Sequence, residues 1–381
     1  MPNYANKAQL RVAGKVWEGW MGLEITRSIE QIASTFTFES AARDPGGKNA
    51  IRIKPGESCE VLLDGDVVLT GWIDAVDLAH DAASHSIRVS GRSKTRDLVD
   101  CSAFWPTGSF KNADVAAIVY SLASQYGVDV GVEGGTEPIP VFTLQDGETV
   151  AECIDRLARS RSLLAYDDAL GWLRMGPVGT ENATSSLILG KNIKSASLKV
   201  DVSKRFDKYH VKGQRASDED AVNAAANAIA AATPTGDAED DPLKEGRTRF
   251  LVLHADGHAT PQSCQDRAIW EAATRAGKSV EVVVTVQGWR QEDGTPWTVN
   301  TLCHVQDSII GVDAKMLIVS VTYRLGSDGT TTTITLAPPC GYIPESPKET
   351  KGKRKGQGKA GAGISLLSDD DAADVIDEAG E

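Results

Sequence analysis

The segment Cys59–Ile73 reads CEVLLDGDVVLTGWI, and its hydrophobic pattern decides the fold class. Apolar side chains recur at about every second position on both sides of Asp64-Gly65, which is the spacing of half-buried β-strands. An Asp-Gly pair readily adopts the positive φ angles that a two-residue hairpin turn requires. The segment therefore predicts a β-hairpin in a fold dominated by strands.

Similar alternation extends this hairpin into a β region that covers residues 1–98. Strand-like runs occur at Ser34–Glu39 and Ser86–Ser90, and turn signals occur at Asp44–Gly47 and Lys54–Gly56. Several short strands at this spacing are typical of a sandwich or a small barrel. We therefore expect a first β-barrel-like domain here.

Residues 99–186 change to a pattern that predicts a small α+β module. A helix is expected over Asp114–Gln125, with Asn112 as its N-cap. A second helix begins at Thr149–Glu152, where a threonine and a glutamate three residues later form a capping box. Leu163–Met175 then reads as a hairpin.

Residues 187–345 return to strand-like alternation and predict a second β-barrel-like domain. Within it, residues 217–246 are rich in alanine and acids, so we expect an insertion loop with one weak helix. A firmer helix is predicted over 261–276, with Thr260 as N-cap and Gly277 after its last turn. Asp328-Gly329 marks a further hairpin.

These patterns together predict a mixed α+β, β-dominated fold with two β-barrel-like domains and an intervening small α+β module. Residues 346–381 follow as a tail, with six basic residues first and an acidic block after them. Neither half of this tail can bury a hydrophobic core, so a charged flexible tail is expected.

Charge and composition exclude several classes of protein. The 381 residues include 40 Lys and Arg against 53 Asp and Glu, which gives a formal net charge of −13. DNA would repel such a chain on average, so we expect no sequence-specific nucleic acid binding. No run reaches the 18–20 apolar residues that a membrane helix needs, so no membrane insertion is expected.

The six cysteines lie at least 37 residues apart and form no CxxC motif, which favours reduced, mostly buried thiols. The first residues lack the apolar core of a secretory signal. Both observations indicate a chain that folds in a cytoplasm.

No pattern in the sequence predicts catalysis. His254 and His258 have metal-ligand spacing but fit better as part of a polar loop, because Gly257 argues against a helix. Asp167 and Asp168 would point to opposite faces of a strand, so a hairpin turn is the better interpretation of that pair. Neither a GxSxG elbow nor a phosphate loop occurs. We therefore expect no enzyme, no cofactor and no metal.

The eight tryptophans are the most distinctive feature of the amino-acid composition. Those beside glycines could form a surface on which sugars stack, although burial in β cores is the commoner arrangement. A short fragment, LTGWI at Leu69–Ile73 and VQGWR at Val286–Arg290, hints at an internal repeat.

The sequence contains four segments in this order: Ile25–Glu39, Val61–Asp100, Phe142–Gly176 and Trp270–Asp307. Together they resemble the baseplate hub family (tail protein P) of Mu-like contractile-tailed bacteriophages. The resemblance implies a structural homotrimer whose two similar domains per chain form a ring of six modules. Such a ring adapts the sixfold tail tube to the threefold central spike during tail assembly and DNA ejection. Implied partners are the spike, the tube and other baseplate proteins, in a virion assembled in the host cytoplasm.

The family offers no catalytic residues to transfer, so the site prediction concerns a partner interface. We expect it at a hairpin tip and in the tail, at Trp289, Gln291, Glu292, Asp293, Trp297, Ile364, Leu366 and Leu367. Merely solvated turns remain an alternative at these positions.

Two other functions remain open: a carbohydrate-binding or cell-wall-degrading tail component, and a cytoplasmic β-rich scaffold. If a ring forms, the net charge of −13 suggests an acidic lumen that lets DNA slide past.

Overall fold

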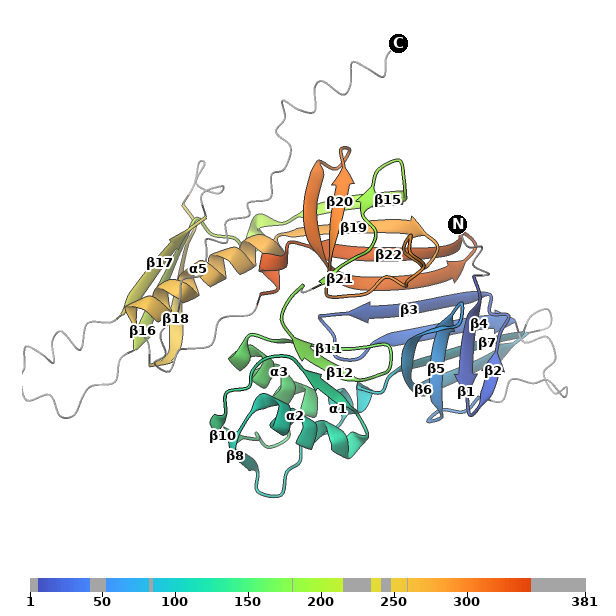
Figure 1. Cartoon of the computed structure of the whole chain (residues 1–381), viewed down its shortest axis with the longest axis horizontal. Coiled ribbons are helices and arrows are strands. Elements are labelled where there is room, and N and C mark those ends of the chain that lie inside the picture. The colour runs from blue at the N-terminus through green and yellow to red at the C-terminus, as the bar shows by residue number, and fades with distance from the viewer. Residues whose placement is uncertain are drawn as a thin grey trace, which may run out of the picture. The chain divides into compact units, whose positions relative to one another are not determined.

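The computed structural model describes residues 6–41, 53–81, 85–179, 181–214, 234–240, 248–258 and 260–343 (Figure 1). These residues divide into two compact units. The first unit holds the residues up to Ser197 together with Val282–Leu336, and the second holds Leu198–Glu281 with the residues that follow Leu336. Strands predominate and helices are fewer, so the prediction of a β-dominated mixed α+β fold is confirmed.

The first β region is an antiparallel arrangement in the order β3-β4-β7-β6-β5-β1-β2. The predicted hairpin lies between β5 and β6, and its turn residues Asp64 and Gly65 have φ angles of 50° and 91°. The seven strands are β1 (Ala8–Val12), β2 (Lys15–Trp17), β3 (Gly22–Ser28), β4 (Thr35–Ala41), β5 (Ser58–Leu63), β6 (Asp66–His80) and β7 (His85–Ser93).

The second β region surrounds the hairpin predicted at Asp328-Gly329, which joins the two longest of its strands. Its strands are β13 (Glu181–Asn182), β14 (Leu187–Ile188), β15 (Ile193–Val200), β19 (Val280–Gln287), β20 (Thr301–Asp307), β21 (Val312–Gly326) and β22 (Gly329–Ala337). β13 and β14 run parallel to β20, and the main path is β15-β19-β22-β21.

A single strand pair joins the two β regions. Ser320–Leu325 of β21 pairs antiparallel with Leu23–Ser28 of β3, so that β3 lies between β4 and β21 (Figure 1). The result is one fourteen-stranded sheet, whose path among the described residues is open and closes into no barrel. The two regions expected from the sequence are therefore continuous with each other through this seam.

Both halves of the large sheet contain the same order of strands. β4 pairs with β7, β7 with β6 and β6 with β5, while β19 pairs with β22, β22 with β21 and β21 with β20. β6 and β21 have 15 residues each, and β7 and β22 have nine each. The chain thus contains an internal repeat. The LTGWI fragment lies within β6, whereas VQGWR starts in the last two residues of β19 and continues past its end. Because β6 and β19 are not counterparts, the two fragments do not trace the repeat.

The small α+β module predicted over residues 99–186 has its helices and strands up to Gly176, and Glu181–Asn182 already pairs with β20 of the second β region. Asp114, and not the expected Asn112, caps the first long helix, because its carboxylate accepts the N–H of Ala117 at 2.7 Å. The capping box of Thr149 and Glu152 is confirmed. The elements from residue 96 onward are α1 (Arg96–Asp100), β8 (Ser109–Ala113), α2 (Val115–Ala123), β9 (Val130–Val132), β10 (Ile139–Thr143), α3 (Val150–Arg161), β11 (Leu164–Asp167) and β12 (Leu173–Gly176).

In its described residues, the second unit contains a three-stranded sheet and the helix α5, which packs on β16 and β17. Its elements are β16 (Lys208–Gln214), β17 (Thr235–Glu239), β18 (Phe250–His258) and α5 (Pro261–Lys278).

Three expectations for this unit need correction. β17 lies inside the stretch 217–246 that was expected to be a loop with a weak helix, and most of the rest of that stretch lies outside the described residues. His254 and His258 belong to a strand and not to a loop, because β18 pairs in parallel with β16. Helix α5 includes Gly277, where a Cβ would lie 2.2 Å from the Gly341 nitrogen, so close packing explains this glycine.

Candidate partner interface

The predicted hairpin tip is a tight turn in which Arg290 bridges to Pro296. Trp289 and Trp297 on its two sides are each only 2% exposed. The indole N–H of Trp289 donates to the carbonyl of Arg324 at 3.0 Å, and the hydroxyl of Tyr323 donates to the carbonyl of Trp297. The two tryptophans therefore belong to the core and fix the tip from beneath, so they present no surface to a partner.

Gln291 is also buried and organises the turn from inside. Its side-chain oxygen accepts the backbone N–H groups of Thr184 and Ser185 at 2.9 and 3.2 Å. Its amide nitrogen donates to the Thr295 hydroxyl and to the Pro296 carbonyl, each at 3.2 Å. Because these bonds satisfy the amide on both sides, Gln291 has a structural role in the turn.

Glu292 and Asp293 are the two predicted interface residues that lie on the surface. Glu292 forms an exposed ion pair with Lys191 at 2.7 Å. Asp293 accepts the N–H of Thr295, and this bond lowers the pKa of its carboxyl. The tip is thus a small acidic surface on a rigid base. Ile364, Leu366 and Leu367 lie outside the described residues.

Arg290 was not predicted, although it connects the tip to the first β region. Its guanidinium lies 2.5 Å from the carboxylate of Asp66 and donates to the carbonyl of Leu63 at 2.8 Å. These partners sit in the β5–β6 hairpin, more than 220 residues away in the sequence. A single sequence carries no signal for such a contact, because pairing across that distance depends on the seam between β3 and β21.

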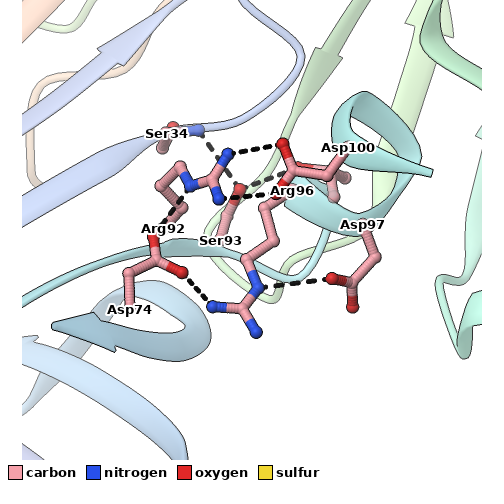
Figure 2. A network of polar contacts seen from close by, with 8 residues as sticks. Ser34, Asp74, Arg92, Ser93, Arg96, Asp97 and Asp100 are labelled. Carbon is pink, nitrogen blue, oxygen red and sulfur yellow. Dashed lines mark hydrogen bonds and ion pairs between the residues drawn. The ribbon is translucent and has the colours of Figure 1, made fainter. Parts of the chain in front are cut away.

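Figure 2 shows a charged network that fastens the β6–β7 pair to α1. Asp74 accepts from Arg92 at 2.7 Å and also from Arg96, while Arg92 forms two parallel bonds with Asp100 at 3.0 and 2.6 Å. This pairing lowers the pKa of the Asp100 carboxyl and raises that of Arg92. Every carboxylate in this network faces a guanidinium, so the network braces the module against the sheet.

Asp167 provides a second, buried link between the module and the sheet. Its carboxylate accepts the hydroxyl of Ser34 at 2.7 Å and the Ser34 N–H at 3.1 Å, while Arg27 donates to its backbone carbonyl. Burial raises the pKa of this carboxyl. Asp168 instead binds the N–H of Trp172 and the Arg174 side chain, so the prediction of a turn and not a carboxylate pair is confirmed.

None of the six cysteines forms a disulfide in the described structure, and four of them are buried. Burial raises the pKa of Cys59, Cys153 and Cys303 to about 12, so these groups stay protonated and unreactive at neutral pH. Among the described residues, no group of three or more His, Cys, Asp or Glu side chains has the geometry of a metal site. No helix in the described part is long and apolar enough to cross a membrane.

Three family models match the chain. The N-terminal domain of the Mu phage baseplate assembly protein GpP-like family matches residues 7–93. The second domain of the baseplate hub protein gp44-like family matches residues 95–177. The fourth domain of the Mu phage baseplate assembly protein GpP matches residues 260–345.

Whole-chain comparisons agree with these matches. The chain is 33% identical to the baseplate hub protein gp44 of Escherichia phage Mu over 373 residues, covering 96% of each chain. Among solved structures, the 43 kDa tail protein of prophage MuSo2 from Shewanella oneidensis is 31% identical with a TM-score of 0.78, over 88% of this chain and 99% of that one.

Two further solved structures share the fold. A tail protein from Neisseria meningitidis MC58 has a TM-score of 0.73 at 23% identity, over 89% of this chain and 98% of that one. An Escherichia coli component of the type VI secretion system has a TM-score of 0.53 at 12% identity, over 89% and 79%. The latter is described as similar to the phage T4 tail proteins gp27 and gp5.

Proposed function

Because this chain belongs to the family of Mu phage baseplate hub proteins, we propose that it is the hub of a contractile phage tail. In this role three copies form a ring that adapts the sixfold tail tube to the threefold central spike during tail assembly and DNA ejection. The protein would be assembled in the host cytoplasm and reside in the virion baseplate. The observation that carries the proposal is 33% identity to a baseplate hub over 96% of both chains.

The internal repeat supports this role physically. Each chain carries the β4-β7-β6-β5 order and its β19-β22-β21-β20 counterpart, so three chains would contribute six similar modules. A ring of this kind offers near-sixfold symmetry where the two repeats look alike. It offers threefold symmetry where the two repeats differ. The same ring can therefore match the sixfold tube on one side and the threefold spike on the other. We propose that residues 1–98 and 187–345 serve as the barrel-like domains, completed by their neighbours in the ring.

The remaining parts would make the peripheral contacts. Residues 99–186 contain five basic and twelve acidic side chains, which is a net −7 of the chain's −13. This module is a candidate for an acidic surface along the path of DNA. The tip at Glu292 and Asp293, together with residues 346–381 around Ile364, Leu366 and Leu367, would contact the spike, the tube or other baseplate proteins.

The proposal is for a non-enzymatic protein. A carbohydrate-binding or wall-degrading component would use exposed tryptophans, whereas Trp20, Trp289 and Trp297 are 7%, 2% and 2% exposed. Zymography of the purified protein on peptidoglycan should therefore show no clearing, while a cleared band would support the alternative.

The mass of the purified protein in solution tests the assembly role. Sedimentation or light scattering should give about three times the chain mass of 40.5 kDa. A monomer at micromolar concentration would contradict the ring. Deletion of residues 364–381 should keep this mass but reduce co-purification with the spike protein, and unchanged co-purification would exclude the tail as a contact.

A further inference from the structure

We propose that the ring closes through a strand pair between copies, in which Ala75–His80 of β6 in one copy pairs with Ile193–Ser197 of β15 in the next. This inference rests on the proposed trimeric ring and specifies its contact. The template is the seam between β21 and β3 within one chain. Because the chain contains an internal repeat, we expect one further seam of this kind for every chain.

β6 and its counterpart β21 differ in how many neighbouring strands they have. The early part of β21 pairs with β20 up to Leu317, and its later part, Ser320–Leu325, pairs with β3. β6 likewise pairs with β5 up to Trp72. Its later part, Ala75–His80, pairs with β7 alone among the described residues. The place that β3 occupies beside β21 is therefore open beside β6.

The exposure of one side chain marks this open place. Tyr323 points to the buried side of the β21–β3 seam, opposite Ile25, and both are 0% exposed. Leu78 lies near the same end of β6, opposite the buried Ile87, yet is 71% exposed. A large apolar residue on the core side of a sheet is normally covered. A neighbouring strand beside β6 would cover Leu78 as β3 covers Tyr323.

β15 and its counterpart β3 occupy equivalent places in the two repeats. Each precedes its repeat in the chain and lies at its edge, β3 beside β4 and β15 beside β19. β3 has a second partner in β21, whereas β15 ends the strand path of the described sheet. A second copy of the chain can supply the partner that β15 lacks, because Ala75–His80 of its β6 has a free edge on the side away from β7 among the described residues.

Charge and edge chemistry fit this pairing. The β21–β3 seam includes an ion pair between Arg324 and Glu24 at 3.0 Å. The proposed seam brings together strands of opposite charge, with Asp77 on β6 and Lys194 on β15. Unpaired strand edges promote uncontrolled association, and a closed heterologous ring removes them. Three such seams would join three sheets into one continuous circle.

Cysteine pairs placed across the proposed seam test it directly. Asp77, Ala79, Ser195 and Ser197 are all exposed, and the four double variants that combine one β6 position with one β15 position sample the register. Opposite residues of antiparallel strands lie close enough for a disulfide. Under oxidation, at least one of these double variants should yield covalent dimers and trimers on a non-reducing gel. Single-cysteine variants and the pair Val16→Cys with Ser197→Cys serve as controls.

The outcomes separate this inference from the proposed function. A trimer by mass that gives no covalent species with any of the four pairs would overturn the seam and leave the ring intact. A monomer by mass would contradict the proposed ring itself, and the seam with it. Covalent trimers that also form in the control pair would show non-specific contact and overturn the seam.

A charge substitution gives an independent readout. Leu78→Asp should weaken trimer formation at least tenfold in dilution experiments, because it places a carboxylate in the buried side of the seam. Leu170→Asp makes the same change at a residue that is 52% exposed in the 167–173 turn, and it should leave the trimer unchanged. Equal behaviour of the two variants would refute the seam.

Discussion

The two β repeats share one strand order but fill it with different side chains. In the first repeat Phe36 of β4 lies opposite Gly91 of β7, and in the second Val282 of β19 lies opposite Leu336 of β22. The first pair combines the large phenylalanine ring with a glycine, which has no side chain. The second pair combines two aliphatic side chains of medium size. The two repeats therefore fill buried cross-strand positions in different ways, and close packing has to be met separately in each.

The repeats also differ in their continuity along the chain. β3 leads to β4 through a short connection, whereas β16, β17, β18 and α5 of the second unit all lie between β15 and β19 in the sequence. The sheet tolerates this insertion because β15 and β19, the strands on either side of it in the sequence, pair with each other in the sheet. A repeat interrupted in this way is invisible to a search for fixed spacing, which explains why sequence offered only a misleading fragment.

The largest expected effect concerns the second repeat. Leu336 is 0% exposed, so Leu336→Ala should destabilise the protein by about 3–4 kcal/mol through lost burial and a residual cavity. Urea unfolding measures this change. A loss below about 1 kcal/mol would show that the second repeat is not packed as described.

Gly91→Ala in the first repeat should destabilise the protein by adding volume, whereas Leu336→Ala does so by removing it. A Cβ on Gly91 would lie 2.1 Å from the Trp72 carbonyl oxygen and 2.6 Å from the Phe36 ring. Gly91→Ala should therefore cost about 2–3 kcal/mol by overpacking in the same unfolding experiment. Neutral behaviour would mean that β6 and β7 are further apart than the structure has them.

The contact between the repeats should have an intermediate effect. Arg290→Ala removes the bonds to Asp66 and to the Leu63 carbonyl and should cost about 1–2 kcal/mol. Asp66→Ala, at an exposed side chain, should cost less than Arg290→Ala. Equal losses from the two variants would place the whole effect in the ion pair and none in the carbonyl bond.

Two carboxyls at the module junction should respond to pH with opposite signs. Burial raises the folded pKa of Asp167, so its contribution to stability is present below the unfolded pKa near 4 and is lost as pH rises. Arg92 lowers the folded pKa of Asp100, so that contribution is present above about pH 4 and is lost as pH falls.

Urea unfolding of Asp167→Asn and Asp100→Asn between pH 3 and 6 measures both signs. Relative to the wild type, the first variant should gain stability as pH rises, and the second should lose it. Parallel pH profiles for the two variants would contradict the assigned environments.

The smallest effect is expected at the hairpin tip. The Lys191–Glu292 pair is exposed, so Glu292→Gln should change the free energy of unfolding by less than about 1 kcal/mol. A larger loss, measured by urea unfolding, would mean that the tip is part of the core.

The sequence predicted local structure well and long-range structure poorly. The Asp64-Gly65 turn, the capping box at Thr149 and the start of α5 follow from backbone and hydrogen-bonding preferences of neighbouring residues. The β3–β21 seam, Arg290 and the buried Asp167 depend on residues more than 100 positions apart. Of the predicted interface residues that the structure describes, only Glu292 and Asp293 lie on the surface. A tryptophan beside a glycine does not tell which face of a strand is covered.

The central claim is that each chain holds two copies of one strand order and that three chains close them into a ring. A cryo-EM reconstruction of the purified assembly that resolves the strands tests it most directly. We predict six alternating repeats around a channel, with β15 of each copy paired to β6 of the next. A ring in which β15 faces solvent, or an assembly that is not threefold, would contradict the account.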